Sequence, residues 1–164
     1  MRTSTPLPRP DWRNPIHLAA FGFGSGAPLT APGTWGTLAA LLPYLLLRDL
    51  SLTYYLGAIA ISFWVGVYLC DKTSKDIGVH DHGGIVWDEF VGLWIALILV
   101  PPGWQWVLLG FVLFRFFDIV KPQPIKWLDS HVSGGFGIMI DDVLAGVFAL
   151  ATLQGVAYFF GVYS

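Results

Sequence analysis

Acidic residues are distributed unevenly along this chain of 164 residues, because nine of the eleven lie between Asp71 and Asp142. Most of them occur in short polar motifs at the ends of strongly apolar segments. Charged side chains in an apolar protein carry a large desolvation free energy. This concentration therefore indicates a metal ion, a cationic partner or a catalytic role. Carboxylates bind Mg²⁺, and neighbouring Arg and Lys side chains bind phosphate. The residue types therefore suit metal-assisted phosphoryl transfer or hydrolysis.

The strongest metal-binding candidates are two adjacent acidic pairs. Asp88 and Glu89 open an apolar segment, where neighbouring carboxylates on a helix can serve one metal ion or two. Asp141 and Asp142 stand in the same relation to the last apolar segment. The alternative is that each pair interacts only with the positive end of a helix dipole. Together with Asp76, these four residues form the predicted set of metal ligands.

A glycine follows each acidic pair at the same spacing. Gly92 lies four residues after Asp88, and Gly146 lies four residues after Asp142. Residues four apart share one face of a helix, so each glycine removes bulk beside a carboxylate that has to approach an ion or another helix. The repeated spacing favours a functional interpretation of both pairs.

Cationic side chains accompany the acids in a third motif. Arg115, Asp118 and Lys121 follow one another at three-residue intervals, so a helix presents them on one side until Pro122 restricts its continuation. Arg binds phosphate through its bidentate fork and Lys binds it as a point charge. The alternative is a structural salt bridge between Arg115 and Asp118, and the two roles can coexist.

Two further polar motifs lie between the apolar segments. Asp71 can pair with Lys75 at the four-residue spacing, and the alternative for this motif is a solvated helix end that anchors the chain by its positive charge. His80, Asp81 and His82 have the residue types of a zinc site, but cysteine ligands are missing and oxygen ligands predominate, which favours magnesium. His80 or Asp81 could instead act as a general base or support a metal ligand.

Glycine-rich stretches precede two of the motifs. Three glycines between residues 22 and 26 precede Thr34 and Thr37, either of which can cap the following helix, and a helix N-terminus attracts phosphate. Glycines also allow helices to pack closely in membranes, and this alternative remains open. The glycines at 134–137 have the same ambiguity, and one interpretation is a loop that folds over the site.

The composition is that of an integral membrane protein. Apolar residues make up 55% of the chain and charged residues 12%, whereas a soluble domain is about 25% charged. The net charge of -2 gives no support to nucleic-acid binding, and the single cysteine excludes an intrachain disulfide. We expect one domain over residues 1–164, with residues 1–13 as an N-terminal tail.

The apolar segments predict an all-α bundle of about four spanning helices. Leu52–Cys70 and Val143–Val162 are long enough to span, and Pro101-Pro102-Gly103 divides two shorter arms into a helical hairpin. The region from Ile16 to Thr34, rich in glycine and proline, predicts a broken or re-entrant element. The remaining segments expected to be helical are Leu38–Leu47, Phe90–Val100 and Trp104–Phe117.

The positions of Lys and Arg predict the orientation. Arg2, Arg9 and Arg13 place the N-terminus in the cytoplasm. Alternation at each crossing then puts the motifs at Lys72 and Lys121 inside and the Pro-Pro-Gly turn outside. Every acidic motif falls on the cytoplasmic side, so the carboxylates are expected to form one site at that face.

Four ordered stretches of this chain resemble phosphatidylglycerophosphatase A. They read PGTWGT at 32–37, SKDIGVHDHGGIVWDEFVG at 74–92, FRFFDIVKPQPI at 114–125 and GGFGIMIDDVLAG at 134–146. The similarity covers nearly the whole chain, and the motifs are long. It implies an all-helical, Mg²⁺-dependent phosphatase of the bacterial inner membrane, which converts phosphatidylglycerophosphate into phosphatidylglycerol at the cytoplasmic face.

The resemblance also ranks the site residues. The implied catalytic residues are Asp88, Asp118, Asp142, His80 and Asp81. The residues expected to bind the substrate phosphate are Lys75, Arg115, Lys121, Thr34 and Thr37. Asp71 and Asp129 are set aside. Attack by a metal-activated water and formation of an aspartyl-phosphate both remain open, as does the oligomeric state.

Two other functions fit parts of the pattern. An ion-coupled membrane transporter also carries acids in its helices, but it holds them near mid-membrane rather than at one face. A metal-binding structural membrane protein also uses packing glycines, but it has no need for this density of carboxylates.

Overall fold

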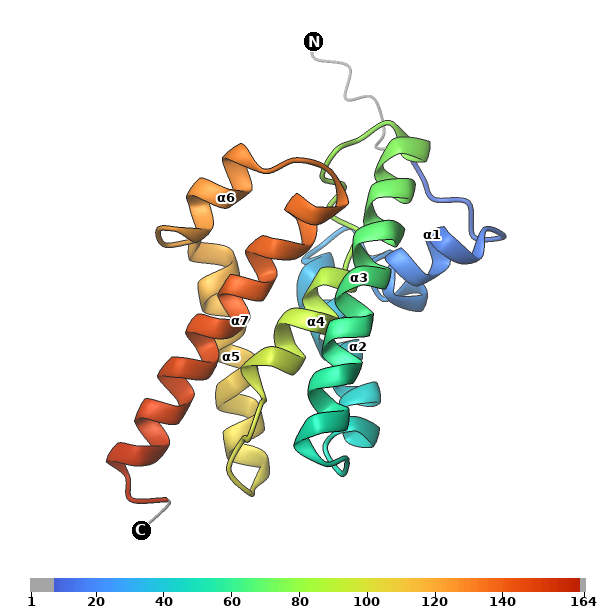
Figure 1. The fold of residues 1–164 in the computed structure, drawn as a ribbon. Helices are drawn as coiled ribbons and strands as arrows, with labels where there is room; N and C mark the ends of the chain where they lie inside the picture. Colours follow the sequence, from blue (N-terminus) through green and yellow to red (C-terminus); the bar gives the residue numbers. More distant parts are fainter. Residues whose placement is uncertain (1–7, 163–164) are drawn as a thin grey trace.

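The structure, a computed structural model, describes residues 8–162 and is all-helical over that range (Figure 1). The predicted fold class is therefore confirmed at the level of all-α. The elements are α1 (Pro15–Ala20), the 3₁₀ helix η1 (Gly22–Gly24), α2 (Pro32–Leu47), α3 (Leu52–Ile77), α4 (Trp87–Ala96), α5 (Trp104–Val120), α6 (Ile125–His131) and α7 (Gly134–Phe159).

The longer helices run roughly along one direction, so the bundle has two ends (Figure 1). At one end lie α1, α6, the end of α3 and the start of α7. At the other end lie the connection between α2 and α3, the turn between α4 and α5, and the end of α7. The 78–86 connection and most of the polar motifs are therefore separated from the short turns at the other end.

Within the described range, two helices, α3 and α7, are long and apolar enough to cross a membrane, with 26 residues each. Both are longer than the sequence predicted. α3 continues through the polar motif that contains Asp71 and ends where Gly78 adopts a left-handed conformation. α7 begins at Gly134, so Asp141 and Asp142 lie in its interior and not at its start. The interpretation of that pair as partners of a helix N-terminus was wrong.

The α4–α5 connection forms where the sequence predicted it. α4 ends at Ala96, Leu97 to Val100 follow as a turn, and α5 begins at Trp104 directly after Gly103. Gly103 has a φ of 117°, which favours glycine. The two arms are short, 10 and 17 residues.

The N-terminal segment is broken, as predicted, into α1, η1 and a connection to α2. The expected caps are not formed, because α2 begins at Pro32 after Ala31, and Thr34 and Thr37 lie inside the helix. The glycines at 134–137 do not form a loop over the site. They make the first turn of α7, where a Cβ on Gly135 would lie 1.9 Å from the carbonyl oxygen of Val67 in α3.

Helix α7 is the centre of the bundle and packs against α3, α4, α5 and α6. Its closest approach to α4 depends on two glycines. A Cβ on Gly146 would lie 2.4 Å from the backbone oxygen of Gly92, and a Cβ on Gly92 would lie 2.9 Å from the backbone oxygen of Asp142. Both helices therefore approach each other through bare backbone, as the repeated glycine spacing suggested.

This crossing can be tested with a matched pair of substitutions in α7. Gly146→Ala should lower the free energy of unfolding by about 1–3 kcal/mol, because the neighbouring atom is backbone and cannot move aside. Gly155→Ala is the control, since no atom lies within 4 Å of its added Cβ, and it should stabilise the helix by up to about 1 kcal/mol. Thermal unfolding in detergent measures both, and equal melting temperatures would contradict the proposed contact.

Candidate functional site

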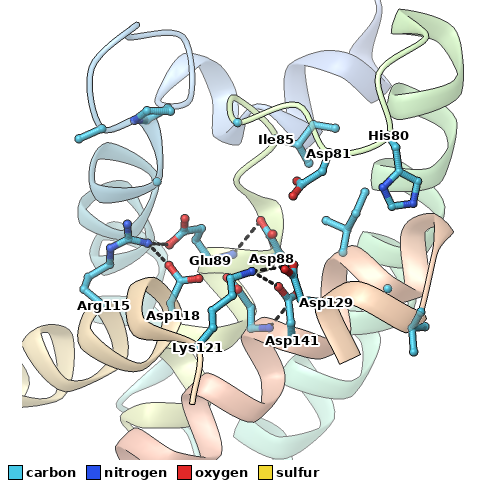
Figure 2. A pocket seen from close by; sticks show the side chains of 18 residues that line it. His80, Asp81, Ile85, Asp88, Glu89, Arg115, Asp118, Lys121, Asp129 and Asp141 are labelled. Atoms are coloured by element: carbon cyan, nitrogen blue, oxygen red, sulfur yellow. Dashed lines mark hydrogen bonds and ion pairs between the residues drawn. The ribbon is translucent and has the colours of Figure 1, made fainter. Parts of the chain in front are cut away.

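One polar cavity of about 270 Å³ lies at the end of the bundle that carries α6 (Figure 2). It is enclosed by the start of α2, the 78–86 connection, the start of α4, the end of α5, and α6 and α7. The titratable side chains that line it are His80, Asp81, Asp88, Glu89, Arg115, Asp118, Lys121, Asp129, Asp141 and Asp142. The structure therefore brings residues from the stretches at 74–92, 114–125 and 134–146 into one site.

Three carboxylates form the most compact cluster at the cavity. Glu89 of α4, Asp118 of α5 and Asp142 of α7 each offer an oxygen, and these oxygens lie within 4.8 Å of one another. Glu89 and Asp142 are buried. All the donors are oxygens, which suits a hard cation such as Mg²⁺ better than zinc. The sequence predicted Glu89 and Asp142 as metal ligands and placed Asp118 among the catalytic residues.

Arg115 partly neutralises the cluster. Its Nη1 donates to Glu89 and to Asp118, so the salt bridge considered as an alternative is present. Thr37 donates a 2.6 Å hydrogen bond to Glu89 Oε2 from inside α2. Thr37 therefore contacts a predicted metal ligand, although it does not line the cavity.

Two buried polar atoms at the cluster lack a partner. Within residues 8–162, only three buried side-chain polar atoms have no hydrogen-bond partner: Asp142 Oδ2, Arg115 Nε and Thr73 Oγ1. Buried polar groups are nearly always satisfied, so an unpaired carboxylate oxygen beside two other carboxylates is the place where a cation fits. The residues present therefore match a divalent metal ion by donor type, proximity and an unmet bonding requirement.

Lys121 is held across the cavity mouth by two helices. It ends α5 in a left-handed conformation, and its Nζ lies 2.6 Å from Asp141 Oδ2 and 2.8 Å from Asp129 Oδ1. Burial acts to lower the pKa of Lys121, but its bonds to these two carboxylates outweigh burial and raise the pKa above its ordinary value. The ammonium group therefore stays charged.

The 78–86 connection covers the cavity from the side of α3. His80 Nε2 accepts a 2.9 Å hydrogen bond from the backbone N–H of Gly134, so it caps the start of α7. Asp81 lies on the same connection, is exposed and has no hydrogen-bond partner among the residues that the structure describes. His80 and Asp81 were the two predicted candidates for a general base. Of the two, Asp81 is the one whose side chain is not engaged by another described residue.

Besides Thr37, which contacts Glu89, three predicted residues lie outside this cavity. Lys75 is exposed and pairs with Asp71 at 2.6 Å, as the four-residue spacing predicted. Asp76 pairs with Lys72 at 2.5 Å and with His17 at 3.2 Å, so it ties α1 to α3. Thr34 lies inside α2 and does not line the cavity. The structure does not bring Lys75, Asp76 or Thr34 to the other site residues.

Asp129 is the residue that sequence reasoning set aside and the structure brings to the cavity. It lies in α6, which returns over the site after the turn at Pro122. The only signal in the sequence was this turn, because a chain that reverses after Pro122 carries the next acid back towards Lys121.

Comparison with known proteins assigns the chain to a family. The family model for phosphatidylglycerophosphatase A matches residues 18–157. The chain belongs to the phosphatidylglycerophosphatase A family. The resemblance inferred from the four motifs is therefore confirmed, and the matched region contains every residue of the cavity.

Three relatives illustrate the breadth of the similarity. Phosphatidylglycerophosphatase A of Haemophilus influenzae is 52% identical over 96% of this chain and 98% of its own length. The Escherichia coli protein of the same name is 52% identical over 90% of this chain and 84% of its own length. A putative phosphatidylinositol-3-phosphatase of Bacteroides thetaiotaomicron is 41% identical over 80% of this chain and 87% of its own length. No solved structure matches the chain significantly.

Metal binding at the three clustered carboxylates can be tested by thermal unfolding, without an activity assay. Mg²⁺ should raise the melting temperature of the purified protein by several degrees, because a ligand at a hundred times its Kd stabilises the folded state by about 2.7 kcal/mol. Asp142→Asn should reduce this shift, since it changes one of the three clustered carboxylates. Asp49→Asn, at an exposed pair with Arg48, should leave the shift unchanged. Equal shifts in all three proteins would argue against a metal at this cluster.

Proposed function

We propose that this protein hydrolyses the terminal phosphate of phosphatidylglycerophosphate, giving phosphatidylglycerol and inorganic phosphate, with Mg²⁺ as cofactor. One observation carries the proposal: three clustered carboxylates and two cationic side chains line a single cavity in a chain of the phosphatidylglycerophosphatase A family. Such a site suits a phosphate monoester, because its charge can be shared between cationic side chains and a metal ion.

Arg115 and Lys121 bind the phosphate in this scheme. Lys121 provides a point charge at the mouth of the cavity, and Arg115 keeps Nη2 and Nε for phosphate oxygens while Nη1 holds the carboxylates. Glu89, Asp118 and Asp142 would hold the Mg²⁺ ion. When bound, the metal supplies positive charge to the phosphoryl oxygens during the reaction.

Asp88 is the candidate acceptor of the proton from the attacking water. It lines the cavity beside the cluster, and its Oδ1 accepts the backbone N–H of Glu89 at 3.0 Å, which leaves Oδ2 to accept the proton. The water oxygen forms a bond to phosphorus as the bond from phosphorus to the glycerol oxygen breaks. The glycerol oxygen takes up a proton from solvent at the open side near Asp81.

The proposal includes the membrane bundle of about four spanning helices expected from the sequence, with the cavity at the cytoplasmic face of the bacterial inner membrane. The positions of the charged residues support it. Lys72, Lys75 and Lys121 belong to the end that carries the cavity, whereas Arg48 lies beside Asp49 at the other end. A phosphorylated headgroup would then reach the cavity from the cytoplasmic leaflet.

Phosphate release tests the reaction, the metal and the substrate together. Purified protein in detergent micelles should release phosphate from phosphatidylglycerophosphate with Mg²⁺ and none with EDTA. Asp88→Asn and Asp142→Asn should lower kcat by at least about 100-fold while the protein stays folded. Phosphatidylinositol 3-phosphate should be a poorer substrate. If the protein preferred it, the proposed activity would instead be the one in the name of the Bacteroides relative. Full activity in both variants would refute their assigned roles.

Lys121 and its two partners allow a second test. Lys121→Met should lower kcat/KM by about 100-fold, because one preorganised donor to the reacting phosphate is lost. Asp129→Asn should lower it by less than about tenfold, since Asp129 is exposed and only positions Lys121. If the two variants lose activity equally, the assignment of Lys121 to the substrate and Asp129 to its support is wrong.

A further inference from the structure

A second hollow lies between α2 and α5 at the opposite end of the bundle from the polar cavity. Its volume is about 710 Å³, and it is lined mainly by apolar side chains. Leu41, Leu42 and Leu45 contribute from α2, and Trp104 and Val107 contribute from α5. The turn at Pro101 to Gly103 closes its far end. We refer to these residues as the α2–α5 groove.

The groove continues the helix faces that form the polar cavity. On α2, Gly33 lines the cavity and Tyr44 lines the groove, and their spacing of eleven residues, about three turns, places them on nearly the same face. On α5, Trp104 lines the groove and Arg115 lines the cavity, eleven residues further along nearly the same face. With a rise of 1.5 Å per residue, these two positions are about 16 Å apart along the helix axis.

The helices leave this space open because each packs mainly on a third. α2 packs on α4, and α5 packs on α7 and α4. Leu42 and Leu45 remain exposed, 71% and 51%, although they face an apolar hollow. In a bilayer such a surface is covered by hydrocarbon.

We propose that the α2–α5 groove binds an acyl chain of the same lipid molecule whose terminal phosphate occupies the polar cavity. This inference rests on the proposed function. A phospholipid carries its phosphate and its chain ends at opposite ends of an elongated molecule, and the two hollows lie in that order along shared helix faces. Arg115 marks the polar end and the leucines of α2 mark the apolar end. The groove would thus select an acylated substrate over its headgroup alone.

Filling the groove tests the proposal. Val107→Trp occupies the groove from α5, and Leu45→Trp occupies it from α2. Leu108→Trp is the matched control, because Leu108 is the exposed neighbour of Val107 and does not line the groove. Phosphate release is measured on two probes, long-chain phosphatidylglycerophosphate in micelles and its deacylated headgroup, glycerophosphoglycerol phosphate. Both carry the same terminal phosphate.

Both groove variants should raise KM for the long-chain lipid by about tenfold, the loss expected when about two methylene groups leave an apolar contact. Their KM for the headgroup and their kcat should equal those of the wild type, and Leu108→Trp should match the wild type on both probes. Unchanged KM for the lipid overturns the acyl-chain assignment and leaves the proposed function intact. An equal loss on both probes also overturns it, because the groove would then shape the fold. Failure of the wild type on both probes refutes the proposed function itself.

The same variants distinguish the substrate's acyl chain from two other possible occupants of the groove. A second copy of the chain in the groove would make the groove variants change the oligomer size, which size-exclusion chromatography with light scattering measures. A lipid of the opposite leaflet would be displaced without any change in KM. Either result contradicts the assignment of the groove to the substrate.

Discussion

The close crossing of α4 and α7 is the constraint on which the rest of the site depends. Gly92 and Gly146 let the two backbones meet, and no side chain larger than hydrogen fits between them without movement. The crossing lies one helical turn from Asp88 and Asp142, so it fixes where those carboxylates project. α5 then joins them through Phe114, which contacts Gly92, and brings Asp118 to the same place.

That geometry concentrates negative charge in an apolar bundle. Among the residues that the structure describes, seven carboxylates and two cationic side chains, Arg115 and Lys121, line the cavity. Arg115 is partly buried between Glu89 and Asp118, and Lys121 is paired with Asp129 and Asp141. The remaining repulsion between the carboxylates lowers the stability of the folded protein, and a bound cation would relieve it. The same carboxylates therefore suit a site that binds a metal ion and a phosphate. The unpaired oxygen of Asp142 is the clearest local sign of this unmet requirement.

The sequence was most informative where spacing and side-chain chemistry acted together. The glycine four residues after each acid, the Pro-Pro-Gly turn and the Asp71–Lys75 pair all have the expected structural counterparts. Helix ends were less predictable, because α3 and α7 continue through polar motifs that tertiary packing supports. Thr37 was expected to cap a helix, yet it supports Glu89 from another one. Asp129 could not be identified, since its approach to Lys121 depends on the path of α6.

Helix α7 has a consequence for how such a protein can be built or changed. It contributes Asp141 and Asp142 to the cavity, packs at the centre of the bundle and is one of the two helices long and apolar enough to cross a membrane. The helix of membrane-spanning length and the cavity are therefore not separate modules joined by a linker. Removing α7 to obtain a water-soluble fragment would also remove two carboxylates that line the cavity and the helix at the centre of the bundle. For the same reason, the cavity could not be transferred to another protein as a separate domain.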